Sequence, residues 1–346
     1  MKDEVVIMKE IVLPLLEWFE ENKRDLDWRK NRTPYTILVS EVMLQQTRVE
    51  AVRSYFKRFI EELPDFKSLA NCPDGKLMKL WEGLGYYSRA RNLKKCAIEI
   101  VEKYNGIFPN TYEQAIKLSG VGAYTCGAVL SLGYNLKYAA VDGNVLRVLS
   151  RCTASSLDIS LEKTKLHFKQ EIEKIMPNAA GTFNESLMEL GATICMPKIA
   201  RCDVCPLKKN CKAYHQENQL SYPVKARPKE KKILEYTCLF ITDGKNYILI
   251  PKEKDLLQGL PSPILIDHFI TSYEAIEALE DLGFYVKNVE QLSDQKHIFT
   301  HQIWYMKGYK VYVEDLLDYP NYTKEQILDE LGVSSCFKKF FEDVWN

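Results

Sequence analysis

The sequence lacks a long hydrophobic segment, an excess of either charge and an internal repeat. Its apolar runs stop well short of the roughly 18 residues that a membrane-spanning helix needs. Both signs of charge are mixed in the first residues, MKDEVVIMKE, which argues against a signal or transit peptide. We therefore expect a cytoplasmic protein without membrane contact, and its 346 residues are enough for two or three domains.

The net charge of zero conceals a division of the chain. Residues 1–230 carry 35 Lys and Arg against 28 Asp and Glu, whereas residues 231–346 carry 12 against 19. A basic first part joined to an acidic second part suits a polyanion-binding domain followed by a domain of another kind. Ordinary variation of surface charge would give the same counts, so charge alone does not decide.

The hydrophobic pattern also changes along the chain. Up to about residue 215, apolar residues recur at three- and four-residue steps, as in TILVSEVMLQQTRVEAVRSYFKRFI, which predicts an all-helical domain. Residues 216–232 are polar, basic and contain proline, as expected of a linker. Beyond them, LEYTCLFITDGKNYILIPK predicts two strands around a turn at Asp243 and Gly244. Residues 233–346 are therefore predicted to form a compact α+β domain.

Four of the ten cysteines stand together in CMPKIARCDVCPLKKNC. Their spacing is C-x6-C-x2-C-x5-C, at Cys195, Cys202, Cys205 and Cys211. A disulfide knot, a structural zinc and an iron–sulfur cluster would each use such a set. Because thiols stay reduced in the cytoplasm, metal ligation is favoured over disulfides, and four thiolates suit zinc or iron.

Two glycine turns are candidates for nucleic-acid contact. In AIKLSGVGAYTCGAVLSL, Gly120 and Gly122 separate a helix that ends at Leu118 from one that begins near Tyr124. Such a hairpin offers backbone N–H groups to a phosphate, although a plain helical hairpin would look alike. In WEGLGYYSRAR, a similar turn precedes Tyr86 and its neighbours, an aromatic and basic mixture suited to entering a duplex.

Two carboxylates are candidates for chemistry. Glu41 borders an apolar side of its predicted helix, where its pKa would be raised and it could act as a general acid. The alternative is a solvated glutamate on an amphipathic helix. Asp142, in AAVDGNVLRVLSR, is either a helix N-cap or a carboxylate that stabilises a cationic sugar. One protonated and one ionised carboxyl group is the division that glycosidic-bond cleavage needs.

Six segments together resemble the adenine DNA glycosylases of the MutY family, within the helix-hairpin-helix glycosylase superfamily. In chain order they are SEVMLQQTRVE, WEGLGYYSRARNL, GVGAYTCGAVLSL, VDGNVLRVLSR, FNESLMELGA and the four-cysteine loop. The resemblance implies an all-α glycosylase domain at residues 1–215, with a six-helix part at about 25–132 and a cluster part at about 1–24 and 133–215. It also implies one 4Fe–4S cluster held by the four cysteines, and a Nudix-like α+β domain after the linker at 216–232.

The resemblance also assigns roles to single residues. Glu41 would protonate a flipped adenine at N7, and Asp142 would stabilise the oxocarbenium-like sugar or trap it covalently. Two side chains would line the sugar and the carboxylates: Tyr124 and Asn144. Four would form the adenine pocket: Arg24, Trp28, Leu44 and Glu185. Four would contact DNA, at the orphaned base or at a phosphate: Gln46, Tyr86, Gly120 and Gly122.

The expected function is excision of adenine opposite 8-oxoguanine or guanine in double-stranded DNA, by a monomer that is nucleoid-associated if the source is bacterial. Endonuclease III-type enzymes carry a Schiff-base lysine where Tyr124 stands, so base removal without a lyase step is expected. The triplet Phe299, Thr300 and His301 resembles the family's Phe-Ser-His loop for 8-oxoguanine. Alternatives are a glycosylase/lyase of the endonuclease III type and a non-catalytic iron–sulfur DNA-binding protein.

Overall fold

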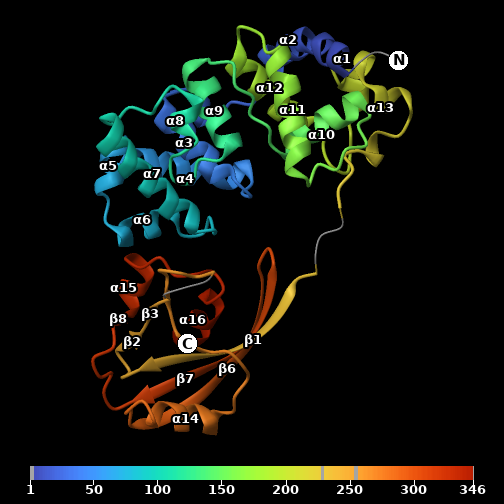
Figure 1. The fold of residues 1–346 in the computed structure, drawn as a ribbon. Coiled ribbons are helices and arrows are strands. Elements are labelled where there is room, and N and C mark those ends of the chain that lie inside the picture. The colour runs from blue at the N-terminus through green and yellow to red at the C-terminus, as the bar shows by residue number, and fades with distance from the viewer. Residues whose placement is uncertain (1–3, 227–229, 253–255, 346) are drawn as a thin grey trace. The chain divides into compact units, whose positions relative to one another are not determined.

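The computed structural model describes residues 4–226, 230–252 and 256–345. The chain divides by its internal contacts into two compact units, one formed by Met1–Asn71 and Arg91–Arg227, the other by Cys72–Ala90 and Pro228–Asn346. Figure 1 shows the first as a set of helices and the second as a sheet with helices beside it. The predicted linker at 216–232 stays a prediction, and its residues 227–229 lie outside the described part.

The first unit is helical, as the three- and four-residue pattern predicted. Its principal helices are α1 (Glu4–Glu10), α2 (Val12–Asn22), α3 (Pro34–Leu44), α4 (Val49–Glu62), α5 (Phe66–Asn71), α8 (Tyr112–Ala115), α9 (Ala123–Tyr134), α10 (Gly143–Thr153), α11 (Glu162–Ile175), α12 (Ala180–Thr193) and α13 (Lys212–His215). Short 3-10 turns are η1 (Asp27–Arg29), η2 (Cys202–Val204), η3 (Lys208–Asn210) and η4 (Gln219–Ser221). Helix α7 (Ser88–Tyr104) begins in the second unit, and α6 (Asp74–Trp81) belongs to it.

Helix α3 is buried almost all round. Thr33 caps it through a reciprocal capping box with Thr36, and Pro34 occupies its first turn. Every residue from Tyr35 to Met43 is buried, including Glu41. A helix that is apolar on all faces belongs inside a protein, so this helix carries its carboxylate into the interior rather than along a solvated stripe.

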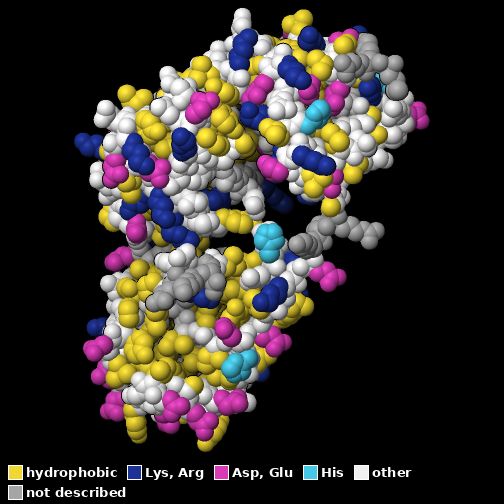
Figure 2. All heavy atoms as spheres, viewed as in Figure 1, with side chains coloured by type: hydrophobic (Ala, Val, Ile, Leu, Met, Phe, Trp, Pro, Cys, Tyr) yellow, Lys and Arg dark blue, Asp and Glu magenta, His cyan; other side chains and the backbone are white. Residues whose placement is uncertain are grey.

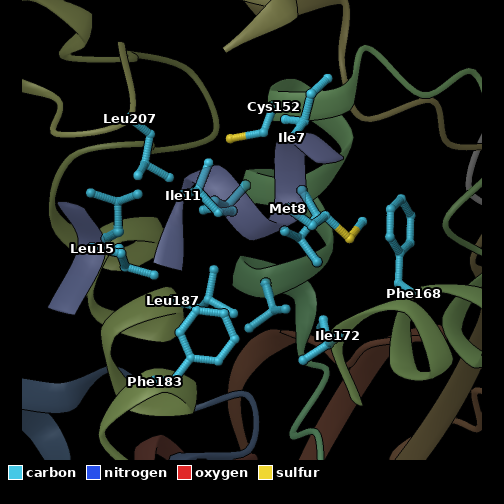
Figure 3. Packing of buried hydrophobic residues seen from close by; sticks show 14 of the residues in the cluster. Ile7, Met8, Ile11, Leu15, Cys152, Phe168, Ile172, Phe183, Leu187 and Leu207 are labelled. Atoms are coloured by element: carbon cyan, nitrogen blue, oxygen red, sulfur yellow. The ribbon is translucent and has the colours of Figure 1, made fainter. Parts of the chain in front are cut away.

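One hydrophobic core ties the N-terminal helices to α10, α11 and α12. In Figure 3, Ile7 and Met8 of α1 and Leu15 of α2 point toward side chains of the later helices, among them Phe168 of α11 and Leu187 of α12. The first two helices therefore pack against elements that follow some 130 residues later in the chain. This core fixes the positions of α10 and α12, which carry candidate site residues.

The segment that leads to Asp142 is held by close backbone approach. A Cβ atom on Gly127 of α9 would lie 2.1 Å from the carbonyl oxygen of Ala139, so only glycine fits there. The buried amide of Asn184 also holds this segment, because its Oδ1 accepts from the N–H of Ala140 at 3.1 Å and its Nδ2 donates to the carbonyl of Tyr138 at 2.8 Å.

The second unit is built on a mixed sheet, as an α+β domain requires. Its strands are β1 (Lys232–Thr242), β2 (Asn246–Ile248), β5 (Ile264–Ile266), β6 (Val286–Ile298), β7 (Gln302–Val313) and β8 (Asn321–Thr323), in the order β6-β7-β1-β2-β8 with β5 beside β1. Strands β3 (Ile250–Pro251) and β4 (Pro261–Ser262) form a separate pair. The helices are α14 (Ser272–Glu280), α15 (Lys324–Asp329) and α16 (Lys338–Trp345).

The register of this sheet confirms the predicted turn at Asp243 and Gly244. Thr242 of β1 pairs with Tyr247 of β2 in antiparallel register, and Gly244 adopts a φ of 98° that suits glycine. Strand β1 runs parallel to β7, which pairs antiparallel with β6. In Figure 2, Asp and Glu side chains are frequent along the outer edge of this unit, in keeping with its acidic composition.

Candidate active site

A cavity of about 1160 Å³ opens within the helical unit. Its walls come from η1, the end of α3, the turn before α9, the start of α10 and one face of α12. Every site residue predicted within this unit, the cysteines excepted, lines it: Arg24, Trp28, Glu41, Leu44, Gln46, Gly120, Gly122, Tyr124, Asp142, Asn144 and Glu185. Five separate segments of sequence thus meet at one place.

Glu41 lies at the inner wall of the cavity and is 7% exposed. Burial raises the pKa of its carboxyl to about 7. The hydrogen bond that Tyr124 donates from its hydroxyl to Oε2 opposes this rise, the charges of Asp142 and Glu185 add to it, and the charge of Arg29 opposes it. Glu41 is therefore divided between its protonated and ionised forms near neutral pH, as a general acid should be.

Asp142 is the N-cap of α10. Its Oδ1 accepts from the backbone N–H of Val145 at 2.8 Å, and its Oδ2 accepts from the Asn144 side chain at 2.7 Å. Burial raises the pKa of the carboxyl, while these hydrogen bonds favour its ionised form. Asp142 also lines the cavity, so the helix cap and the place at the cavity wall belong to the same side chain.

A ladder of ion pairs between the η1 region and α12 forms part of the cavity wall. Glu189 of α12 accepts from Arg24 Nε at 2.7 Å and from Arg29 Nη2 at 2.9 Å. Glu185, one turn earlier, accepts from Arg29 Nε at 3.2 Å and is paired with Arg32 at 2.6 Å. Arg24 and Glu185 were predicted from the sequence, whereas Arg29 and Glu189 were not. Only the position of Glu189 one turn after Glu185 on the same helix could have indicated it.

Apolar side chains complete the space beside the ladder. Trp28 of η1 is 7% exposed and meets Phe56 edge to face, with ring centroids 5.6 Å apart. Leu44 and Met188 line the cavity as well, and the Met188 sulfur lies 3.4 Å from the Tyr124 hydroxyl. Flat apolar walls with a few polar groups are typical of sites that hold a planar ring.

The glycine hairpin lies at the rim of the cavity. Helix α9 begins at Ala123, directly after Gly122, and Gly120 has a φ of 74°. The turn is fixed from outside because Glu99 accepts from both the backbone N–H and the hydroxyl of Ser119, at 3.2 and 2.6 Å. Lysines line the same cavity: Lys165, Lys169 and Lys225.

The four-cysteine loop follows α12. Cys195, Cys202, Cys205 and Cys211 are free thiols and border one small cavity with Cys152 of α10. Arg151 donates to the sulfur of Cys195 at 3.2 Å and to the carbonyl of Met196 at 2.9 Å. Within the described residues, no three Cys, His, Asp or Glu side chains lie close enough together to hold a metal ion. The four sulfur atoms of the loop therefore border one cavity without lying at metal-ligand distances from a common centre.

The triplet of the second unit lies at a hairpin tip. Thr300 and His301 are exposed in the turn between β6 and β7, closed by a bond from the N–H of Phe299 to the carbonyl of Gln302 at 2.9 Å. The hydroxyl of Tyr86, a residue of this unit with a φ of 49°, forms a hydrogen bond with Thr300. Two residues selected for the same base are thus brought together.

Comparison with known proteins gives this arrangement a family. The family model for HhH-GPD superfamily base excision DNA repair proteins matches residues 39–177. An adenine DNA glycosylase of Buchnera aphidicola subsp. Baizongia pistaciae is 33% identical over 315 residues, which make up 90% of this chain and 88% of that protein. The chain belongs to the adenine DNA glycosylase family. The resemblance found in the sequence is therefore confirmed.

Solved structures confirm the helical glycosylase fold expected for the family. The structure of a thermostable thymine-DNA glycosylase is similar with a TM-score of 0.56 and 30% identity, over 61% of this chain and 98% of that one. A trapped endonuclease III–DNA covalent intermediate is similar with a TM-score of 0.54 and 25% identity, over 63% of this chain and 99% of that one. No helix in the described ranges is long and apolar enough to cross a membrane.

Proposed function

We propose that this member of the adenine DNA glycosylase family removes adenine paired with 8-oxoguanine or guanine from duplex DNA, without cutting the strand. The observation that carries the proposal is the meeting of Glu41, with a pKa of about 7, and Asp142 in one cavity. A proton donor beside an ionised carboxylate is what cleavage of a glycosidic bond uses. The relative's name specifies adenine, and the endonuclease III complex contains DNA.

The positions of these groups support a general-acid mechanism. A nucleotide rotated out of the duplex places its base between Trp28 and the ladder of ion pairs. Glu41 gives its proton to adenine N7, the bond from N9 to C1′ breaks, and its electron pair leaves with the base. The carboxylate of Asp142 stabilises the positive sugar until water adds to C1′ and loses a proton. Tyr124 and Asn144 hold the two carboxyl groups in place.

The rim of the cavity suits the DNA backbone. Backbone N–H groups at the start of α9 follow Gly122, which has no side chain to keep a phosphate at a distance and no atom within 4 Å of where a Cβ would stand. The lysines that line the cavity supply positive charge. Gln46 is exposed two residues after the end of α3, with a φ of 59°, and would enter the base stack.

The decisive experiment uses three duplexes that each contain a single A:8-oxoguanine, A:G or A:T pair. We expect sites that break only after alkali treatment, in the first two duplexes and not in the third. Because Tyr124 cannot form an imine with the sugar, borohydride should trap no protein–DNA adduct. Trapping would establish the lyase alternative instead, and binding without alkali-labile sites would establish a non-catalytic DNA-binding protein.

The cysteine loop suits a 4Fe–4S cluster as a structural cofactor. Cys195, Cys202, Cys205 and Cys211 surround one cavity, and Arg151 already donates to a sulfur as it would to a ligating thiolate. When bound, the cluster would order the loop and the lysines that it carries. Zinc is the competing metal, since four thiolates also bind it.

We expect purified protein to be yellow-brown and to contain about four irons per chain, since a cubane cluster has four irons and four thiolate ligands. Absorption spectra and metal analysis measure this. Cys202→Ser should lower iron content and thermal stability, whereas Cys72→Ser, at a buried cysteine away from the loop, should leave iron unchanged. A colourless protein that contains stoichiometric zinc and is fully active would contradict the cluster.

The second unit is proposed to recognise 8-oxoguanine through the hairpin tip. The Thr300 hydroxyl and the His301 imidazole are exposed there, and hydrogen bonds of this kind discriminate between bases by about 1–3 kcal/mol. Alanine at both positions should therefore narrow the ratio of excision rates between A:8-oxoguanine and A:G duplexes by about tenfold. Single-turnover rates on both duplexes measure this ratio.

Two controls accompany that prediction. Thr300→Ser keeps the hydroxyl and should leave the ratio within about twofold of its original value. Alanine at Lys245, in the turn between β1 and β2, and at Asn246, the first residue of β2, alters another hairpin of the same sheet and should leave the ratio unchanged. A ratio unchanged by the double substitution at 300 and 301 would remove lesion recognition from this hairpin.

A further inference from the structure

Glu189 is the most completely paired carboxylate of the cavity wall. Its side chain is 1% exposed, although it carries charge. Arg24 donates to Oε1 from its backbone N–H at 3.1 Å and from Nε at 2.7 Å, and to Oε2 from Nη2 at 2.9 Å. Arg29 donates to Oε2 at 2.9 Å. Burial alone would raise the pKa of Glu189, but these bonds outweigh it and lower the pKa to about 2.

Arg29 is the member of this ladder whose charge acts on Glu41, and both side chains line the cavity. Besides Glu189, it donates to Glu185 Oε1 at 3.2 Å and to the carbonyl of Arg24 at 2.9 Å, and its guanidinium stacks on Phe19. Its side chain is 12% exposed, so its charge acts through protein rather than through solvent. The direction in which this cation points is set mainly by the carboxylates that it pairs with.

The groups that face Glu41 come from four elements. Tyr124 of α9 donates a hydrogen bond, Asp142 at the start of α10 and Glu185 of α12 favour the protonated form, and Arg29 of η1 opposes it. Around the ladder, Glu50 of α4 adds a further negative charge beside Arg24. Arg29 is thus the one cation acting on Glu41 among these groups, and its second counter-ion is Glu189.

We propose that Glu189 is a positioning residue for the acid step: it holds the Arg29 guanidinium between two carboxylates and thereby keeps its charge from drawing the proton off Glu41. The inference rests on the proposed function, in which Glu41 must be protonated to act. Glu189 itself touches neither the proton nor the leaving base. It acts through Arg29, and its removal would leave a buried cation with a single carboxylate partner facing the cavity.

Glu189→Gln is the primary test, because it keeps the shape and removes the charge. In the original protein, single-turnover excision should fall as pH rises through the pKa of Glu41, about 7. We call this fall of the excision rate at high pH the alkaline limb. In the variant, the alkaline limb should move to lower pH by about one unit, so the rate at pH 8 should be roughly a further tenfold lower. The rate at pH 5.5, where Glu41 stays protonated, should change by less than about threefold.

Two further variants separate charge from shape. Arg29→Gln together with Glu189→Gln removes the cation with its counter-ion, and this double variant should return the limb to its original pH. Arg24 loses Glu189 in both variants, but its side chain is 31% exposed and reaches solvent. The double variant therefore removes the half-paired buried Arg29 and provides the test if Glu189→Gln alone folds poorly. Glu171→Gln is the matched control, because Glu171 of the neighbouring α11 is ion-paired and buried but does not line the cavity. Its limb should not move.

The outcomes are distinct. A limb shifted in Glu189→Gln and restored in the double variant supports the inference. A limb that stays in place, or a loss equal at every pH with a lowered melting temperature, assigns Glu189 a purely structural role and overturns it. Failure of the proposed function would look different. The excision rate of the original protein would then either show no alkaline limb or keep that limb in Glu41→Gln.

Discussion

Glu41→Gln should lower the single-turnover rate of adenine excision at pH 7 by two to four orders of magnitude, the usual effect of losing a general acid. The amide has nearly the same shape and can still accept the hydrogen bond from the Tyr124 hydroxyl, so binding of an A:8-oxoguanine duplex should persist. Rates with enzyme in excess and a separate binding measurement distinguish the two effects. A variant that keeps near-full rate would falsify the assignment of the acid.

The same substitution should stabilise the fold at alkaline pH. Because the folded-state pKa of Glu41 lies near 7 and the ordinary value is 4.5, the folded protein binds this proton more tightly than the unfolded chain. The stability that results is complete below about pH 4.5 and is lost as pH rises through 7. This rise in the pKa of Glu41 corresponds to about 3 kcal/mol in the free energy of unfolding. Glu41→Gln should remove this pH dependence of stability, which denaturant unfolding at pH 5 and pH 8 would measure.

Asp142→Asn should also lower excision by at least two orders of magnitude, because the carboxylate that faces the sugar cation becomes neutral. Its effect on the fold should be small. Asparagine is as good an N-cap as aspartate, so its side-chain oxygen can still accept from the N–H of Val145. Thermal unfolding should therefore shift little while the rate falls, and duplex binding should remain.

Asp65→Asn is the control for that experiment. Asp65 accepts from the backbone N–H of Ser68 at 2.7 Å before α5, in a comparable cap, and does not line the cavity. The control should retain the full rate. If Asp142→Ala and Asp142→Asn both kept the rate of the original protein, Asp142 would be only the helix cap that its local sequence first suggested.

The glycine hairpin was predictable because it is local. The residues of a turn lie within a few positions of one another, and their backbone needs, such as the φ of 74° at Gly120, depend on few neighbours. The predicted strand turn at Gly244 was correct for the same reason. The helical character of the first unit followed from the hydrophobic period alone.

The environment of Glu41 depended on tertiary structure. Its helix looked amphipathic enough that a solvated glutamate was a fair alternative, but packing of other elements on every side of α3 buries the residue. A desolvation effect on pKa depends on all the atoms around a group, and no window of sequence contains them.

By itself, the sequence determined which chemical groups are available: two carboxylates, a tyrosine, a glycine hairpin and four thiols in a readable order. Only the tertiary structure decided the pKa values of these groups and the side chains that they pair with. Arg24 and Arg29 meet Glu189 across a separation of 165 and 160 residues, and no local pattern selects such a pair. The physical reason is that charges act through space, so the contact is fixed by how η1 packs near α12 and not by spacing along the chain.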